Sequence, residues 1–266
     1  MTPVPVFIYH SVSDDPEPWI APYTVSPKAF VEQLDRIEAS GRTVVPLRSL
    51  VAALRGGPPL PDRCAVLTFD DGHEDFYWTV APLLTERDLP ATLYLTTGAI
   101  RVPGGRASGS MLPEAPMLNW RQVSTLDALG FELGAHSRTH AQLDTLPARR
   151  LADEVKGSRA DLEDALGHHV RAFAYPHGYS SAAVRRCVAA AGFGSATAVV
   201  NAFSSAQDDP LRIARLMVMA DTPAERFQQW ADGRGAPVAP FPEHLRTRAW
   251  RVYRRVRSSL GRPVAC

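Results

Sequence analysis

Two aspartates stand side by side directly after an apolar run, in the stretch AVLTFDDGHEDF at residues 65–76. An Asp-rich turn after a strand is common in proteins of every kind, so Asp70, Asp71 and Gly72 alone predict no chemistry. Adjacent carboxylates repel one another, however, and the pair has a use where a metal lies nearby. One carboxylate can then bind the ion while the other serves as a base for an attacking water.

Histidines follow other apolar runs in the same manner. His10 ends FIYH, His136 ends ELGAH with His140 four residues later, and His177 follows FAYP. A single histidine at such a place is more often structural than functional. His136 and His140, one helical turn apart, can nevertheless reach one ion, and an added aspartate gives a two-His, one-carboxylate set with open positions. The pattern therefore predicts a metal site.

Apolar runs and amphipathic segments alternate about seven times along the chain, which is typical of a mostly parallel sheet covered by helices, either a barrel or a doubly wound sheet. In both, active residues collect where the strands end on the carboxyl side. Ser26 and Asn119 are expected N-caps. We expect strands near 4–9, 43–47, 64–69, 91–95, 131–136, 170–175, 193–200 and 215–219, and helices near 26–40, 47–56, 76–88, 119–130, 147–167, 181–191 and 222–232.

The composition is that of an ordinary soluble enzyme. The 266 residues are 45% hydrophobic and 21% charged, and the net charge of +1 does not indicate a nucleic-acid partner. Three cysteines without a C-x-x-C pair argue against a disulfide framework and against a thiolate metal site. No secretory signal and no apolar run of membrane-spanning length is visible, so we expect a cytoplasmic protein.

The combination of TFDDG (68–72) with HSRTH (136–140) resembles the polysaccharide deacetylase family, whose members remove acetyl groups from N-acetyl sugars. The resemblance covers roughly residues 4–220 and implies an α/β fold, a distorted barrel of about seven strands and helices. It also implies that Asp70 is the general base. By the same resemblance Asp71, His136 and His140 bind a divalent metal, most often Zn²⁺, with Co²⁺, Ni²⁺ or Fe²⁺ as alternatives.

Two family motifs are altered here. R-P-P-Y-G corresponds to AYPHG (174–178), so the arginine that orients the base is missing, and the late L-x-x-H that supplies the acid is absent after residue 200. Both departures suit a subgroup resembling the poly-N-acetylglucosamine deacetylases, in which the barrel is circularly permuted. His10 then becomes the candidate acid and Arg215 the candidate replacement for the arginine. Substrate contacts are expected from Tyr175, Pro176 and His177, and oxyanion stabilisation from backbone N–H groups of residues 175–178.

The resemblance implies a metal-dependent hydrolase that removes an N-acetyl group from an amino sugar. Without a visible signal peptide, a lipid-linked sugar, a nucleotide sugar or a small metabolite is a more natural substrate than a cell-wall polymer. A catalytically impaired relative that binds glycans is the alternative, because the motif arginine is missing. An iron oxygenase is disfavoured, since its usual H-x-D spacing and all-β barrel do not appear.

The last part of the chain differs from the rest in charge. We expect a catalytic domain at 1–240 and a basic amphipathic helix at 241–266, where residues 243–262 hold seven arginines and one acid. This helix either packs on the barrel with a solvated basic face or lies on an anionic membrane, at the inner membrane face, with Trp250 at the interface. Its apolar stripe is Leu245, Ala249, Val252, Tyr253, Val256 and Leu260.

Overall fold

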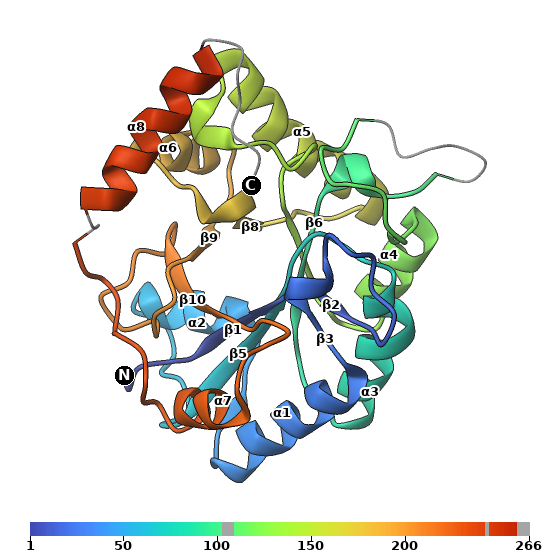
Figure 1. The fold of residues 1–266 in the computed structure, drawn as a ribbon, viewed down its shortest axis with the longest axis vertical. Coiled ribbons are helices and arrows are strands. Elements are labelled where there is room, and N and C mark those ends of the chain that lie inside the picture. The colour runs from blue at the N-terminus through green and yellow to red at the C-terminus, as the bar shows by residue number, and fades with distance from the viewer. Residues whose placement is uncertain (103–108, 243–244, 260–266) are drawn as a thin grey trace.

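The computed structural model describes residues 1–102, 109–242 and 245–259. Figure 1 shows a central ring of strands with the helices around its outside. The strands are β1 (Val6–Tyr9), β2 (Ser11–Val12), β3 (Thr24–Val25), β4 (Thr43–Val44), β5 (Cys64–Phe69), β6 (Thr92–Leu95), β7 (Glu132–Ala135), β8 (Ala172–Ala174), β9 (Ser195–Val199) and β10 (Ile213–Met217).

The helices alternate with these strands. Short helical turns are η1 (Ala21–Tyr23), η2 (Phe76–Val80), η3 (Thr97–Ala99), η4 (Leu143–Thr145) and η5 (Pro176–Gly178). The α-helices are α1 (Pro27–Ala39), α2 (Leu47–Leu54), α3 (Ala81–Glu86), α4 (Trp120–Ala128), α5 (Ala148–Leu166), α6 (Ala182–Ala190), α7 (Ala224–Ala231) and α8 (Leu245–Ser259).

Seven parallel strands close the barrel, in the order β1, β10, β9, β8, β7, β6 and β5. Closure comes from β1, which pairs with β10 on one side and with β5 on the other, where Tyr9 stands opposite Phe69. Strand β4 pairs only with the start of β5. The (β/α)7-type barrel is confirmed, and its parallel strands bring all their carboxyl ends to one mouth.

Two helices begin at the predicted N-caps. The Ser26 hydroxyl accepts a hydrogen bond from the Ala29 N–H, and Pro27 occupies the first turn, where no N–H is needed. Asn119 and Gln122 form a capping box, since each side chain accepts from the other residue's backbone N–H. These caps fix the starts of α1 and α4 on the outside of the barrel.

The helix expected over 76–88 begins as a π-helical turn, η2, and continues as α3. Pro82, near the start of α3, has no N–H to donate, which accounts for the change of hydrogen-bond pattern at this point. Aromatic rings pack this segment against the barrel. Phe69 lies 4.9 Å from Phe76 and 5.2 Å from Tyr9, measured between ring centroids, so β5 is held from both sides just below its carboxyl end.

Helix α8 packs on the barrel, but not through its predicted apolar stripe. Its inward residue is Arg254, which is buried and bonded to Asp144 in η4. Val252 is 60% and Tyr253 47% exposed, so that part of the prediction is wrong. The side chain of Leu245, like Leu260, lies outside the described residues. No helix in the described part of the chain is long and apolar enough to cross a membrane.

Candidate metal centre and active site

Asp70 and Asp71 lie at the carboxyl end of β5, and both side chains are buried. The chain turns sharply here, with φ angles of 74° at Asp71 and 92° at Gly72. A Cβ on Gly72 would lie 2.8 Å from Leu95 Cδ2, so both the angle and the space require glycine. Because Asp71 itself adopts the left-handed conformation, strand alternation ends there and both carboxylates can share the barrel mouth.

His136 and His140 are held by a loop after β7, so the prediction of a helical turn is wrong. Ser137 and His140 have φ angles of 62° and 63°, which an α-helix excludes. The Ser137 hydroxyl accepts from the His140 N–H at 3.0 Å, and Glu154 on α5 accepts from two further N–H groups of the loop. These bonds stabilise an unusual backbone that presents both imidazoles to the mouth.

The three predicted ligands converge. Asp71 Oδ1 lies 3.5 Å from His136 Nε2 and 3.3 Å from His140 Nε2, and one donor atom of each lies within 4.8 Å of the others. Ligands at about 2.1 Å from one tetrahedral ion stand roughly 3.4 Å apart, so the spacing suits a shared divalent metal. Asp71 Oδ1 is also buried without a hydrogen-bond partner among the described residues, which fits an oxygen that binds a cation.

The protonation states suit metal binding. His136 Nδ1 lies 2.9 Å from the Ala174 carbonyl oxygen, which leaves Nε2 for an ion. Burial lowers the pKa of His136 to about 4, so its ring is neutral at neutral pH. Burial would raise the pKa of Asp71, but His140 and His73 beside it hold that pKa well below its usual range.

Arg215 on β10 lies against Asp70. Its two terminal nitrogens donate to the two Asp70 carboxylate oxygens at 2.7 Å each, and Nη1 also donates to the Thr68 hydroxyl at 3.1 Å. Arg215 is fully buried. Burial would raise the pKa of Asp70, but the Arg215 guanidinium, with His136, lowers it. Asp70 is therefore a charged carboxylate held in one orientation beside the candidate ligands.

His10 follows β1 and lies next to the end of β5, because the Asp70 N–H donates to the Tyr9 carbonyl at 2.9 Å. The ring is 5.3 Å from that of Tyr23, and its buried Nδ1 has no hydrogen-bond partner in the described part of the chain. Burial lowers the pKa of His10, while the carboxylates of Asp71 and Asp70 oppose this shift. The structure thus brings His10 to the same mouth as the aspartates.

The three predicted substrate contacts differ in position. Tyr175 is buried in the core and its hydroxyl donates to the Leu211 carbonyl at 2.8 Å, and Pro176 is buried as well. The His177 ring lies 4.5 Å from that of His140, between centroids. His177 is therefore the one of the three whose side chain adjoins the candidate ligands.

The expected oxyanion donors are largely occupied. The Tyr175 N–H donates to the Thr197 carbonyl and the Gly178 N–H to the Tyr175 carbonyl. For these two groups the expectation of oxyanion stabilisation is therefore wrong. The turn itself is tightly packed, since a Cβ on Gly178 would lie 2.7 Å from Val199 Cβ at a φ of 73°.

His73 was not among the predicted site residues. It is 3% exposed, its Nε2 lies 3.7 Å from Asp71 Oδ2, and its ring is 5.8 Å from that of Trp19. The contact places it behind Asp71 at the mouth of the barrel. Its position directly after TFDDG was the signal that could have identified it.

Comparisons with known proteins agree on one family. The family model described as polysaccharide deacetylase matches residues 57–196. The poly-beta-1,6-N-acetyl-D-glucosamine N-deacetylase of Escherichia coli K12 is 40% identical over 68 residues, which are 26% of this chain and 10% of that protein. The match thus spans about a tenth of that curated relative's length.

Solved structures show the same fold. IcaB from Ammonifex degensii superposes with a TM-score of 0.74 at 23% identity, covering 87% of this chain and 98% of that one. A de-N-acetylase from Aggregatibacter actinomycetemcomitans gives 0.75 at 20% identity, with 85% and 99% covered. The Streptococcus pyogenes deacetylase PplD gives 0.73 at 23% identity, with 86% and 98% covered.

Proposed function

This chain belongs to the polysaccharide deacetylase family, and on that basis we propose that it is a metal-dependent hydrolase of N-acetylated amino sugars. It removes the acetyl group and releases acetate and the free amine. The observation that best supports this is the pair of contacts made by the two adjacent aspartates at the end of β5. Asp71 lies between two histidine nitrogens, and Asp70 beside it is bound by Arg215.

Asp71, His136 and His140 hold the metal in this proposal. Nitrogen and oxygen ligands in this set suit Zn²⁺, with Co²⁺, Ni²⁺ and Fe²⁺ as alternatives. A bound ion of this kind polarises the acetamide carbonyl and lowers the pKa of water. The neutral His136 and the charged Asp71 are in the states that such binding requires.

Asp70 accepts a proton from the attacking water, whose oxygen bonds to the acetamide carbon. Arg215 keeps the Asp70 carboxylate charged and oriented, so one oxygen lone pair is presented to the water throughout. The C–N bond then breaks as protonated His10 donates to the sugar nitrogen, which would otherwise be a poor leaving group. Asp70 and His10 follow the neighbouring strands β5 and β1, which suits a proton acceptor and a proton donor that act on one substrate.

The motif arginine is missing from residues 174–178, and this was the reason to consider a catalytically impaired glycan-binding protein. The contact of Arg215 with Asp70 supports the catalytic proposal, because it supplies the same kind of partner from another strand. A glycan, a lipid-linked sugar, a nucleotide sugar and a small metabolite stay the candidate substrates. Cytoplasmic location, peripheral membrane contact and a domain boundary at residue 240 stay predictions.

Acetate release tests the proposal. Purified protein, reloaded with Zn²⁺, Co²⁺, Ni²⁺ or Fe²⁺, is incubated with a panel of N-acetylglucosamine compounds, and acetate is measured enzymatically. We expect release with at least one metal and its loss after chelation. Glycan binding without acetate release under any metal would favour the glycan-binding alternative.

A further inference from the structure

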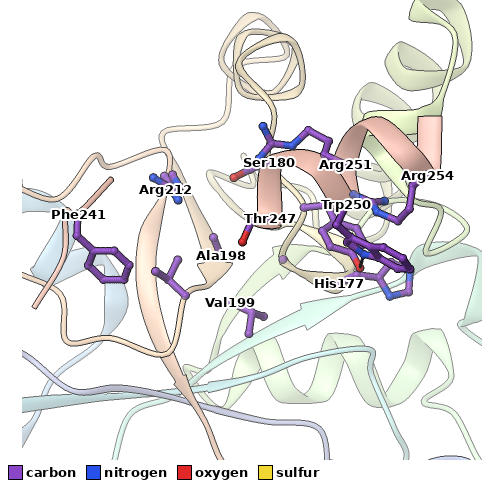
Figure 2. Close-up of a pocket in the computed structure, with 13 residues that line it drawn as sticks. His177, Ser180, Ala198, Val199, Arg212, Phe241, Thr247, Trp250, Arg251 and Arg254 are labelled. Atoms are coloured by element: carbon purple, nitrogen blue, oxygen red, sulfur yellow. Dashed lines mark hydrogen bonds between the residues drawn. The ribbon is translucent and has the colours of Figure 1, made fainter. Parts of the chain in front are cut away.

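A pocket of about 180 Å³ lies between α8 and the carboxyl side of the barrel (Figure 2). We call it the α8 pocket. It is lined by residues 177–180 after β8, residues 198–200 at the end of β9, Arg212, Phe241 and four side chains of α8. Its volume exceeds that of a single water several times over, so it can admit a small chemical group.

The α8 wall is fixed by a buried ion pair. Arg254 is 1% exposed, donates to both Asp144 carboxylate oxygens at 3.0 and 2.8 Å, and lies 3.4 Å above the centre of the Tyr179 ring. Arg255 Nε also donates to the Asp144 carbonyl at 2.9 Å. Separating a buried pair of this kind is unfavourable, so the pair holds α8 in place as one wall of the pocket.

The lining carries a net positive charge. Arg212, Arg251 and Arg254 contribute to it, and none of the lining residues described is an aspartate or glutamate. Asp144 behind the wall lies 2.8 Å from Arg254 and 3.9 Å from Arg251, so the two α8 arginines together supply one net positive charge. No carboxylate of the described residues lies within ion-pair distance of Arg212, and Asp209, three residues before it, lies 4.0 Å from Arg185. In Figure 2, Arg212 stands on one side of the pocket and the α8 arginines on the other. A group between them meets positive charge from two elements.

The α8 pocket adjoins the candidate metal centre. His177 lines the pocket, and its ring is 4.5 Å from that of the candidate ligand His140. One side chain therefore separates the two sites.

We propose that the α8 pocket binds a phosphate group carried by the substrate, so that the substrate is a phosphorylated N-acetyl amino sugar. The proposal rests on the proposed function, because it places the acetamide at the metal ligands and the phosphate beyond His177. The guanidinium of Arg212 can bind phosphate oxygens with charge-assisted hydrogen bonds, whereas both terminal nitrogens of Arg254 already donate to Asp144 and Arg254 contributes charge only. Ser180 and Thr247 add hydroxyl donors to the lining, and Trp250 and Phe241 offer rings for the group beyond the phosphate.

Substrate preference tests the proposal. We compare kcat/KM for N-acetylglucosamine 1-phosphate with kcat/KM for N-acetylglucosamine. The wild type should prefer the phosphorylated sugar by about tenfold or more, as expected for charge-assisted contacts, and Arg212→Gln should lower that ratio about tenfold. The control is Arg63→Gln, an exposed arginine before β5 at the other end of the barrel, which should keep the wild-type ratio.

Binding measured by calorimetry is independent of turnover. N-acetylglucosamine 1-phosphate and inorganic phosphate are titrated into wild type, Arg212→Gln and Arg63→Gln. Affinity should fall about tenfold in Arg212→Gln alone, whereas phosphate bound at a metal would be unaffected by that change. If no compound yields acetate but binding still depends on Arg212, the proposed function fails and the pocket assignment stands.

Equal affinity of wild type and Arg212→Gln, or a wild-type preference that survives in Arg212→Gln, would overturn the pocket assignment even with normal acetate release. Competition by uridine diphosphate and by farnesyl diphosphate then distinguishes a nucleotide-linked from a prenyl-linked substrate. Stronger competition by one of them identifies the group attached to the phosphate. Competition by neither, while binding of N-acetylglucosamine 1-phosphate still depends on Arg212, would support a sugar phosphate whose phosphate carries no further group.

Discussion

Arg215 binds both carboxylate oxygens of Asp70 through two parallel hydrogen bonds of 2.7 Å, and both side chains are buried. The two residues are 145 positions apart in the sequence and come from β10 and the end of β5, on either side of β1. A planar guanidinium fixes a carboxylate in position as well as in charge. The pair therefore presents Asp70 beside the candidate metal ligands as an oriented base.

Removal of the Asp70 charge is the first test of this arrangement. Asp70→Asn should keep its metal, since Asp70 is not a ligand, but it should be less stable than the wild type because Arg215 then lacks a carboxylate partner. It should lose most turnover because an amide cannot accept the water proton. Acetate release and metal content are measured together. Asp62→Asn, an exposed residue before β5, is the matched control. Turnover of Asp70→Asn near the wild-type rate would show that Asp70 is not the base.

The stability of the pair is a separate prediction. Arg215→Met leaves the Asp70 carboxylate buried and uncompensated, so it should lower the free energy of unfolding by about 3–5 kcal/mol. The double variant Asp70→Asn/Arg215→Met removes both charges and should recover part of that loss. Urea denaturation of the wild type, both single variants and the double variant measures the coupling. Effects that add within about 0.5 kcal/mol would mean that the two residues do not stabilise one another.

Metal content tests the three ligands. Purified protein should contain about one divalent ion per chain after dialysis, and the double variant His136→Ala/His140→Ala should contain almost none, because two of three ligands are gone. Elemental analysis measures the content. His169→Ala, which removes an exposed histidine bonded to Glu163, should keep the ion. Stoichiometric metal in the double variant would mean that the ion binds elsewhere.

The closeness of Asp71, His136 and His140 could be predicted because it follows from a property that all folds of this class share. Alternating strand and helix patterns indicate a parallel sheet, and the carboxyl ends of parallel strands meet at one edge. Residues of metal-binding type at several such ends are then neighbours, however far apart they lie in the sequence. The same reasoning brought His10 to this mouth, whereas Arg215, which lies within β10, was a candidate only through the resemblance to the permuted subgroup.

Other features of the structure could not be predicted from the spacing of residue types in the sequence. The loop after β7 depends on positive φ angles at Ser137 and His140, and side-chain periodicity carries no information on backbone angles. The orientation of α8 depends on one specific pair, Arg254 with Asp144, which overrides the apolar stripe. Hydropathy patterns treat an arginine as a solvated residue and so miss a buried partner elsewhere in the fold.

The role of His10 as proton donor can be tested with substrates that differ in their leaving group. His10→Ala should lower turnover on an N-acetyl sugar by roughly 10²–10⁴-fold, the usual range for a general acid. An activated aryl acetate needs no proton on its leaving group, so the loss with that substrate should be much smaller. His169→Ala again serves as the control. An equal loss on both substrates would show that His10 maintains structure and does not donate the proton.

The last prediction concerns the pH dependence of stability in the metal-free protein. Burial, with the neighbouring His140 and His136, lowers the pKa of His177 to about 3, and burial lowers that of His136 to about 4. An unfolded chain has histidine pKa values near 6.5. Below that pH it binds more protons than the folded chain, so the free energy of unfolding must fall as the pH falls.

Between pH 7.5 and 5, His177 should contribute about 1–2 kcal/mol to this decrease in the free energy of unfolding, after allowance for its partial exposure. Urea denaturation of chelator-treated protein at the two pH values measures the difference, which should be smaller by this amount in His177→Gln and unchanged in the exposed control His169→Gln. An unchanged difference in His177→Gln would mean that His177 titrates as a solvated histidine.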